Sequence, residues 1–306
     1  MNNSINLLLY DKSGQVLFTL TKNITLRFEK EYYTPYTSLK ASFIFDGDIS
    51  NVAEAELVVN GHHLHRGIVD TLNTYFSGGV RIIAITSRGK TSMLLNNELP
   101  EGILSNPSLN VILDQKKVIP GVTHENLSQT VNYIYVMEHA SVWEVLTNLC
   151  LKQYNSCPFI SGTNCVRFTK STAVTFSPQK ITEKSAGTDF SKIISACHMK
   201  DANDQYTFNL TDAEAVGMGI VREKYLPLDR QWLADSQTGL SYRINLGMRG
   251  YKYSYLGYDG FSGEDINDVI SYGGKATEIS RIVITSGKIG LSTKLYSYFD
   301  RYCNKL

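Results

Sequence analysis

A short segment, Arg88-Gly89-Lys90-Thr91, has the residue types that end a phosphate-binding P-loop. In the motif G-x-x-x-x-G-K-S/T, the first glycine lets backbone amides surround a phosphate. That position is Ala84 in this chain, so the spacing of the motif is not met. The segment instead predicts a turn between a strand and a short helix.

A second group, His62, His63 and His65, directly follows an Asn60-Gly61 turn. On a strand, His63 and His65 share one face, where they could bridge a metal ion. No HExxH motif and no carboxylate at a telling offset accompanies them. We therefore expect a solvated strand face here rather than a metal site.

Cysteines form a third group. Cys150, Cys157 and Cys165 could converge in space, but a catalytic cysteine needs a nearby base to form its thiolate. His124 and His139 are available in the sequence, although nothing fixes their geometry. Cys150 falls on the apolar face of a predicted helix, where cysteine is commonly a small core residue.

Carboxylates form the last group, with Glu264, Asp265 and Asp268 in a Gly-rich loop. The DxDxDG spacing of an EF-hand calcium loop is absent, and Asp259-Gly260 reads as a turn. No other catalytic motif is found. We expect a non-enzymatic protein with no catalytic residues, no cofactor and no metal site.

Composition bounds the class of protein. The 306 residues include 42% hydrophobic and 19% charged side chains, enough for a core with a modestly charged surface. The net charge of +1, without a basic stripe, argues against specific nucleic-acid binding. We expect neither a signal peptide nor a membrane-inserted segment. The five cysteines are odd in number and lack a CxxC pair, which predicts reduced thiols in a protein assembled in the cytoplasm.

Residues 1–97 predict an antiparallel meander of about six or seven strands. Strands at 5–10 and 15–21 flank a turn, and residues 24–29 alternate between apolar and polar side chains. Asn60-Gly61 and Ser77-Gly78-Gly79 are hairpin turn sequences. Such a sheet must close or be covered, because free strand edges invite pairing with other chains.

Residues 98–179 predict a small α/β insert. Its clearest element is a helix at 142–154, with Ser141 and Glu144 as a capping box, followed by a hairpin around 161–164. Residues 180–306 return to strands, with one predicted helix at 229–248 and a closing hairpin at 278–299. The predicted fold class is α+β, predominantly β, with two β-rich domains on either side of the insert.

Two stretches resemble the baseplate hub of Mu-like phages, the late control D family. The first includes Gly67-Ile68-Val69-Asp70, the strand and turn at 82–89, a short Leu-rich helix at 91–95 and Pro100. The second includes the helix near 232–248, the acidic Gly-rich loop, and Arg281-Ile282-Val283-Ile284 followed by the strand at 291–295.

The resemblance implies two tail-tube-like β-barrel domains in each chain and a homotrimer, which forms a ring of pseudo-sixfold symmetry. Such a hub joins a hexameric tail tube, or its initiator protein, to a trimeric central spike. Other baseplate and tape-measure proteins are the further expected partners. The expected location is a contractile phage tail, or a released phage-tail-like bacteriocin (tailocin), assembled in the bacterial cytoplasm.

Tyrosines are numerous, at 19, and pair apolar area with a hydroxyl group, which suits subunit contacts. We predict that Tyr33 and Tyr36, beside Pro35, and Tyr253 and Tyr255, in a late strand, lie at such contacts. The alternative is that they line the cores of their own domains.

Two other functions remain open. A tail-associated receptor-binding protein would usually show repeats or a lectin-like C-terminal region, and neither is evident. A cell-wall hydrolase would need a Cys or His site built from residues distant in the sequence.

Overall fold

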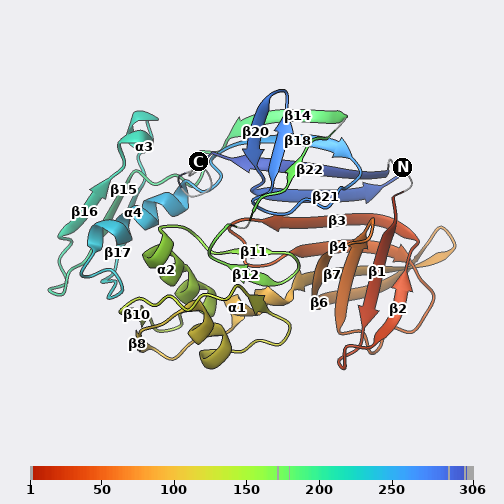
Figure 1. Ribbon diagram of the computed structural model, residues 1–306, viewed down its shortest axis with the longest axis horizontal. Helices are drawn as coiled ribbons and strands as arrows, with labels where there is room; N and C mark the ends of the chain where they lie inside the picture. Colours follow the sequence, from red (N-terminus) through yellow and green to blue (C-terminus); the bar gives the residue numbers. More distant parts are fainter. Residues whose placement is uncertain (1–2, 171, 179, 289, 300, 302–306) are drawn as a thin grey trace.

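The computed structural model describes residues 3–170, 172–178, 180–288, 290–299 and 301. Figure 1 shows one large sheet, with smaller mixed units of helices and short strands beside it. The prediction of an α+β fold dominated by β-structure is confirmed. None of the helices in the described ranges is long and apolar enough to cross a membrane.

Seven antiparallel strands form in the first part of the chain, as predicted, but they do not make a continuous meander, because β4 pairs with β7 and β1 pairs with β5. The hairpin turns have the expected chemistry, because Asn60 and Gly61 both adopt positive φ, as do Gly78 and Gly79. Two-residue loops of this kind match the twist of the strands that they join. The strands are β1 (Ile5–Tyr10), β2 (Val16–Leu20), β3 (Asn23–Glu31), β4 (Ser38–Ile44), β5 (Glu54–Val59), β6 (His62–Ser77) and β7 (Val80–Gly89).

The insert is built around helix α2 (Val142–Tyr154), whose capping residue is confirmed. The Ser141 hydroxyl accepts a hydrogen bond of 3.2 Å from the Glu144 amide. A separate apolar core surrounds this helix. The other elements are η1 (Lys90–Ser92), α1 (Met93–Asn96), β8 (Gly102–Ser105), η2 (Val111–Lys116), β9 (Thr123–His124), β10 (Tyr133–Val136), β11 (Phe159–Ser161) and β12 (Cys165–Arg167).

Strands return after the insert, as predicted. Ile289, which opens the last predicted strand, lies outside the described residues. The elements are β13 (Thr175–Phe176), β14 (Ile181–Thr188), β15 (Ala196–Met199), β16 (Phe208–Thr211), α3 (Ala213–Gly217), β17 (Glu223–Leu226), α4 (Ser236–Gly247), β18 (Lys252–Asp259), β19 (Val269–Tyr272), β20 (Lys275–Glu278), β21 (Arg281–Gly287) and β22 (Gly290–Tyr298).

The helix predicted at 229–248 was placed too early, because α4 begins only at Ser236. Asp235 caps it by accepting a hydrogen bond of 3.3 Å from the Thr238 amide. The preceding residues form turns that place Trp232 in the core. Gly239 makes this packing possible, since a Cβ there would lie 2.5 Å from the Cβ of Trp232.

The two β-rich regions share one sheet of eleven strands, in the order β14-β18-β22-β21-β3-β4-β7-β6-β5-β1-β2. They meet where β21 pairs antiparallel with β3, with Ile284 opposite Phe28. The described strands leave this sheet open, with β14 and β2 at its ends. The domain boundaries at residues 97/98 and 179/180 remain predictions.

A repeated strand order lies within this sheet. The first block, β3, β4, β6 and β7, is arranged β3-β4-β7-β6, and the second block, β14, β18, β21 and β22, is arranged β14-β18-β22-β21. Numbered along the chain, both blocks have the order first, second, fourth, third. Every neighbouring pair in both blocks is antiparallel.

One apolar core extends beneath both blocks. Alternation on the strands fills it: Leu26 and Phe28 of β3 are buried, whereas Arg27 between them is exposed. From the second block, Ile282 and Ile284 join the same cluster. The shared core explains why the two blocks form a single sheet.

Two neighbouring residues of β4 test this core. Phe43 is fully buried and Ile44 points outward. We predict that Phe43→Ala lowers the free energy of unfolding by about 3 to 5 kcal/mol, because it leaves a cavity. Ile44→Ala should lower it by about 1 kcal/mol or less. Urea unfolding of the two variants measures the difference, and equal losses would contradict the assigned faces of β4.

Candidate functional site

A cleft brings together two of the groups that the sequence singled out. The β5–β6 turn contributes His62 and His63, and the loop before β19 contributes Glu264 and Asp265. The cavity between them has a volume of about 310 Å³, with residues of β3 and β21 among its lining. All three regions of the chain meet here, because Gly162 of the insert also lines it.

An ion pair between Lys30 and Asp265 lies at the centre of this meeting point. Lys30 is almost completely buried and also donates a hydrogen bond of 2.7 Å to the Gly162 carbonyl. The Asp265 carboxylate accepts further hydrogen bonds from the Gly162 amide, at 2.7 Å, and the Ser161 hydroxyl, at 3.2 Å. One carboxylate therefore connects β3, the β11–β12 hairpin and the loop before β19.

The other two carboxylates of the acidic cluster also have partners within the protein. Glu264 accepts hydrogen bonds from the Tyr258 hydroxyl and the Ser262 amide. Burial and the neighbouring Glu264 raise the pKa of Tyr258 well above its ordinary value. Asp268 accepts from the amides of Val174, at 3.0 Å, and Asp265, at 2.8 Å. The cluster thus fixes the fold of its own loop.

No group of three or more His, Cys, Asp and Glu side chains in the described ranges is placed to hold a metal ion. His62 lies with its ring edge-on to Phe261, at 5.7 Å between ring centres. His63 contacts Glu56, with Nδ1 2.6 Å from the carboxylate.

The expected solvated face is wrong for His65, which is completely buried. Its Nε2 lies 2.8 Å from the Ser87 hydroxyl and its Nδ1 lies 2.7 Å from the Thr37 hydroxyl. Ser87 donates its own proton to the Ile68 carbonyl, so it accepts from His65 Nε2. Burial lowers the pKa of His65 to about 3, so the imidazole is neutral near pH 7 and Nδ1 accepts from the Thr37 hydroxyl. With its proton already engaged, Ser87 is not arranged as a nucleophile.

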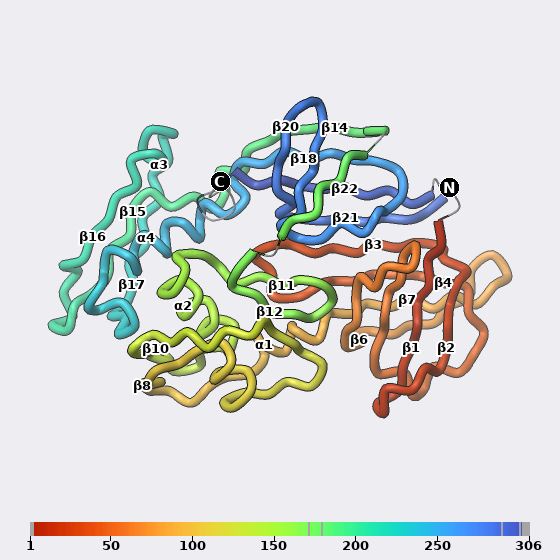
Figure 2. Tube along the Cα trace, in the orientation of Figure 1, coloured from red at the N-terminus to blue at the C-terminus, as the bar shows by residue number. Residues whose placement is uncertain are grey.

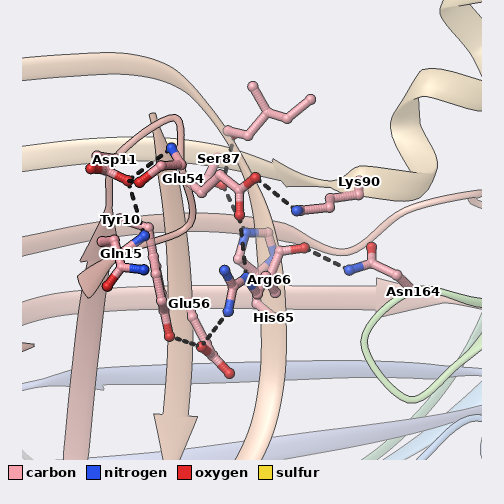
Figure 3. Close-up of polar contacts among 12 residues, drawn as sticks. Tyr10, Asp11, Gln15, Glu54, Glu56, His65, Arg66, Ser87, Lys90 and Asn164 are labelled. Carbon is pink, nitrogen blue, oxygen red and sulfur yellow. Dashed lines mark hydrogen bonds and ion pairs between the residues drawn. The ribbon is translucent and has the colours of Figure 1, made fainter. Parts of the chain in front are cut away.

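Next to His65, a series of polar contacts surrounds the first residues of β6 (Figure 3). Arg66 donates 3.2 Å to Glu54 and 3.4 Å to Glu56, and its guanidinium lies 3.8 Å from the centre of the Tyr10 ring. Burial and a hydrogen bond to Glu56 raise the pKa of Tyr10 to about 12. Lys90 contacts Glu54 at 2.7 Å, so the lysine of the P-loop-like segment is bound to a carboxylate. The prediction of a strand-to-helix turn at 88–91 is confirmed.

Asn164 connects the insert to the same region (Figure 3). Its side chain donates 2.8 Å to the Arg66 carbonyl and accepts 3.3 Å from the Thr91 amide. Gly89 leaves room for this approach, since a Cβ there would lie 2.8 Å from the Thr37 hydroxyl oxygen and 3.2 Å from Asn164. The glycine of the Arg-Gly turn thus serves close packing between strand and insert.

Cys150 is a core residue, as predicted. It is fully buried on α2, and burial raises its pKa well above the ordinary thiol value. The free cysteines also include Cys157, Cys165 and Cys197. Cys303 lies outside the described residues.

The four predicted interface tyrosines are all partly buried within the chain. The Tyr33 ring lies parallel to Tyr298, with 6.4 Å between ring centres, and Tyr36 lies 5.9 Å from the Arg88 guanidinium. Tyr253 and Tyr255, on β18, both contact the Tyr296 ring, at 6.1 and 4.9 Å. Their place at subunit contacts stays a prediction.

Sequence reasoning missed the burial of Lys30 and His65. A signal for Lys30 was present, because the alternation of Leu26 and Phe28 on β3 places Lys30 next on the core face. No comparable signal marks His65, whose partners Thr37 and Ser87 come from two other segments.

Solved structures with a similar fold include the following three. The tail protein from Neisseria meningitidis MC58 has a TM-score of 0.71 at 13% identity, covering 99% of this chain and 98% of that one. The prophage MuSo2 43 kDa tail protein from Shewanella oneidensis has a TM-score of 0.68 at 14% identity, covering 96% and 98%. The E. coli c3393 protein has a TM-score of 0.55 at 8% identity, covering 93% and 76%.

The c3393 protein is described as a component of the type VI secretion system with structural similarity to the T4 bacteriophage tail proteins gp27 and gp5. No protein-family model matches this sequence, and no curated protein matches it. At these identities the comparisons establish the fold, which is that of phage tail proteins.

The buried ion pair gives a stability test. We predict that Lys30→Met lowers the free energy of unfolding by about 3 kcal/mol, because Asp265 loses its charged partner in a largely buried place. Lys40→Met, on the exposed face of β4, should change it by about 0.5 kcal/mol or less. Equal effects of the two variants in urea unfolding would show that the pair does not anchor the cleft.

The buried histidine predicts a pH dependence. Burial lowers the pKa of His65 to about 3, from 6.5 in the unfolded chain. The unfolded state therefore binds the extra proton first. Stability should fall as pH drops below 6.5, by about 1.4 kcal/mol per pH unit, until about pH 3. His65→Gln should remove this part of the slope between pH 6 and 4, and an unchanged slope would contradict the assignment.

Proposed function

We propose that this chain is the structural hub of a contractile-tail baseplate: a homotrimer that joins a hexameric tail tube to a trimeric central spike. Its function then lies in contacts between subunits, without enzymatic activity. It would assemble in the bacterial cytoplasm and act within a virion tail or a phage-tail-like bacteriocin.

The repeated strand order is the observation that carries this proposal. One chain holds two blocks of the same topology, side by side in one sheet. Three copies of such a chain provide six equivalent blocks, which is the arrangement needed to match threefold to sixfold symmetry. A closed ring of copies also removes free sheet edges, which are otherwise open to unwanted pairing.

The likeness to phage tail proteins and to a type VI secretion component supports a place in a contractile tail. The spike, the tube or tube-initiator protein, and other baseplate and tape-measure proteins are the proposed partners. The polar groups of the cleft support a structural role, because Lys30, Glu264 and Asp265 bond to other parts of the same chain.

Mass and shape test the proposal. We predict that the purified chain, alone or with its spike, scatters light as an assembly containing three copies of the 34.3 kDa chain. Electron micrographs should show rings about as wide as a tail tube. Zymograms against peptidoglycan should show no hydrolysis. A chain that remains monomeric and joins neither tube nor spike would refute the hub.

A further inference from the structure

Besides the end strand β2, two strand edges in the sheet lack a partner among the described residues. β14, eight residues long, pairs only with β18. β6 pairs with β5 only as far as Ile68, and its continuation from Thr71 to Ser77 pairs with β7 alone. Figure 2 traces this continuation into a hairpin that extends beyond the neighbouring strands.

The direction of the free hydrogen-bonding groups on β6 follows from its hairpin. Ser77 and Val80 face each other across a two-residue loop, so they exchange hydrogen bonds. Every second residue back along β6 then bonds to β7, and the residues between them turn outward. Leu72, Thr74 and Phe76 therefore present their N–H and C=O groups at the edge, where no other backbone bond of the described chain uses them.

Exposed aromatic side chains lie along this edge of β6. Phe76 is 77% exposed and Tyr75 is 46% exposed. Thr74 lies opposite the buried Ile83, and Phe76 is on the same face of the sheet as Thr74. Phe76 therefore extends the core-facing side of the sheet beyond the buried core. An open strand edge with bare aromatic side chains is a template for another strand.

The repeated blocks supply a model for that other strand within the chain itself. β6 occupies in the first block the position that β21 occupies in the second, and β14 corresponds to β3. Because β21 pairs with β3, the same contact is available between β6 of one copy and β14 of the next. β2, the other open edge, lies outside both blocks.

The register of this contact follows from two rows of paired residues. Ser77 corresponds to Gly287, since each precedes the hairpin loop of its block, and Tyr75 therefore corresponds to Thr285. In the first block, Thr86, Lys40 and Arg27 lie opposite one another across β7, β4 and β3. The corresponding residues of the second block are Tyr296, Tyr255 and Ser185, across β22, β18 and β14. Within the chain, Thr285 lies opposite Arg27.

We propose that β6 of one copy pairs antiparallel with β14 of a second copy, with Tyr75 opposite Ser185. The pairing rests on the proposed ring and specifies the strands that close it. Leu72, Thr74 and Phe76 then hydrogen-bond to Thr188, Ala186 and Lys184 of the second copy.

The side chains suit this register. Phe76 meets Lys184, whose ammonium group lies 5.8 Å from the centre of the half-exposed Tyr272 ring. The lysine stem and the tyrosine ring offer Phe76 an apolar surface. Residues 71–77 carry no charge, so they introduce no repulsion. Glu183 keeps its own partner, Lys294, at 2.6 Å.

A disulfide between copies tests the register. Tyr75 and Ser185 would form a non-hydrogen-bonded pair, the closer kind, which suits a disulfide. We predict that Tyr75→Cys/Ser185→Cys, oxidised in solution, converts the monomer band of a non-reducing gel into dimer and trimer bands. Tyr75→Cys/Ala186→Cys places the second thiol on the opposite face and should remain monomeric on the gel. Each single variant controls for bonds to native cysteines.

A backbone variant gives an independent measurement. Thr74→Pro removes an outward N–H without removing a hydrogen bond to β7, so the trimer should be lost while the thermal melt of the chain is retained. Thr74→Ala keeps the N–H and should keep the trimer.

The outcomes separate this pairing from the hub itself. A trimer that gives no Tyr75→Cys/Ser185→Cys crosslink and tolerates Thr74→Pro would refute the pairing and leave the hub intact. Equal crosslinking by the Ala186→Cys control would refute the register. A chain that neither associates nor crosslinks would refute both.

Discussion

Antiparallel pairing between β3 and β21 is the constraint on which the rest of the structure depends. The two strands are separated by most of the chain, and their pairing aligns Phe28 with Ile284. Closing so long a loop costs conformational entropy, which must be offset by burial. The apolar cluster beneath both blocks supplies that burial. Once the pair forms, hydrogen bonding is continuous across the large sheet, and each block has its position relative to the other.

Polar contacts then fix the insert against this sheet. Lys30 and Asp265 meet beside Gly162, and Asn164 reaches from the same hairpin to the strand carbonyl of Arg66. Apolar packing alone is tolerant of small shifts, whereas these bonds have narrow distance and angle requirements. The cleft between the β5–β6 turn and the loop before β19 is therefore also the place where three regions of the chain are held in register.

Repetition within a single sheet links the fold to the proposed assembly. In a protein with two similar blocks, the blocks make one contact with each other inside the chain. The outer strands of the blocks can make a similar contact with another copy. The inner contact, β3 with β21, is satisfied by the chain itself. The outer edges, β14 and the far half of β6, are not. This asymmetry between a paired inner edge and unpaired outer edges is what a ring-forming subunit requires.

The sequence by itself determined the features that depend on near neighbours. Alternation on β3, the turns at Asn60-Gly61 and Gly78-Gly79, and the Ser141 cap were predictable, because each involves residues a few positions apart. Tertiary structure decided the rest. The strand order repeats without a visible sequence repeat, since a strand needs only alternation of side chains and not their identity. Likewise, Lys30 and His65 form hydrogen bonds with partners from distant segments. A buried charge or imidazole is stable only when it has such bonds, so the burial of both residues depends on the tertiary structure.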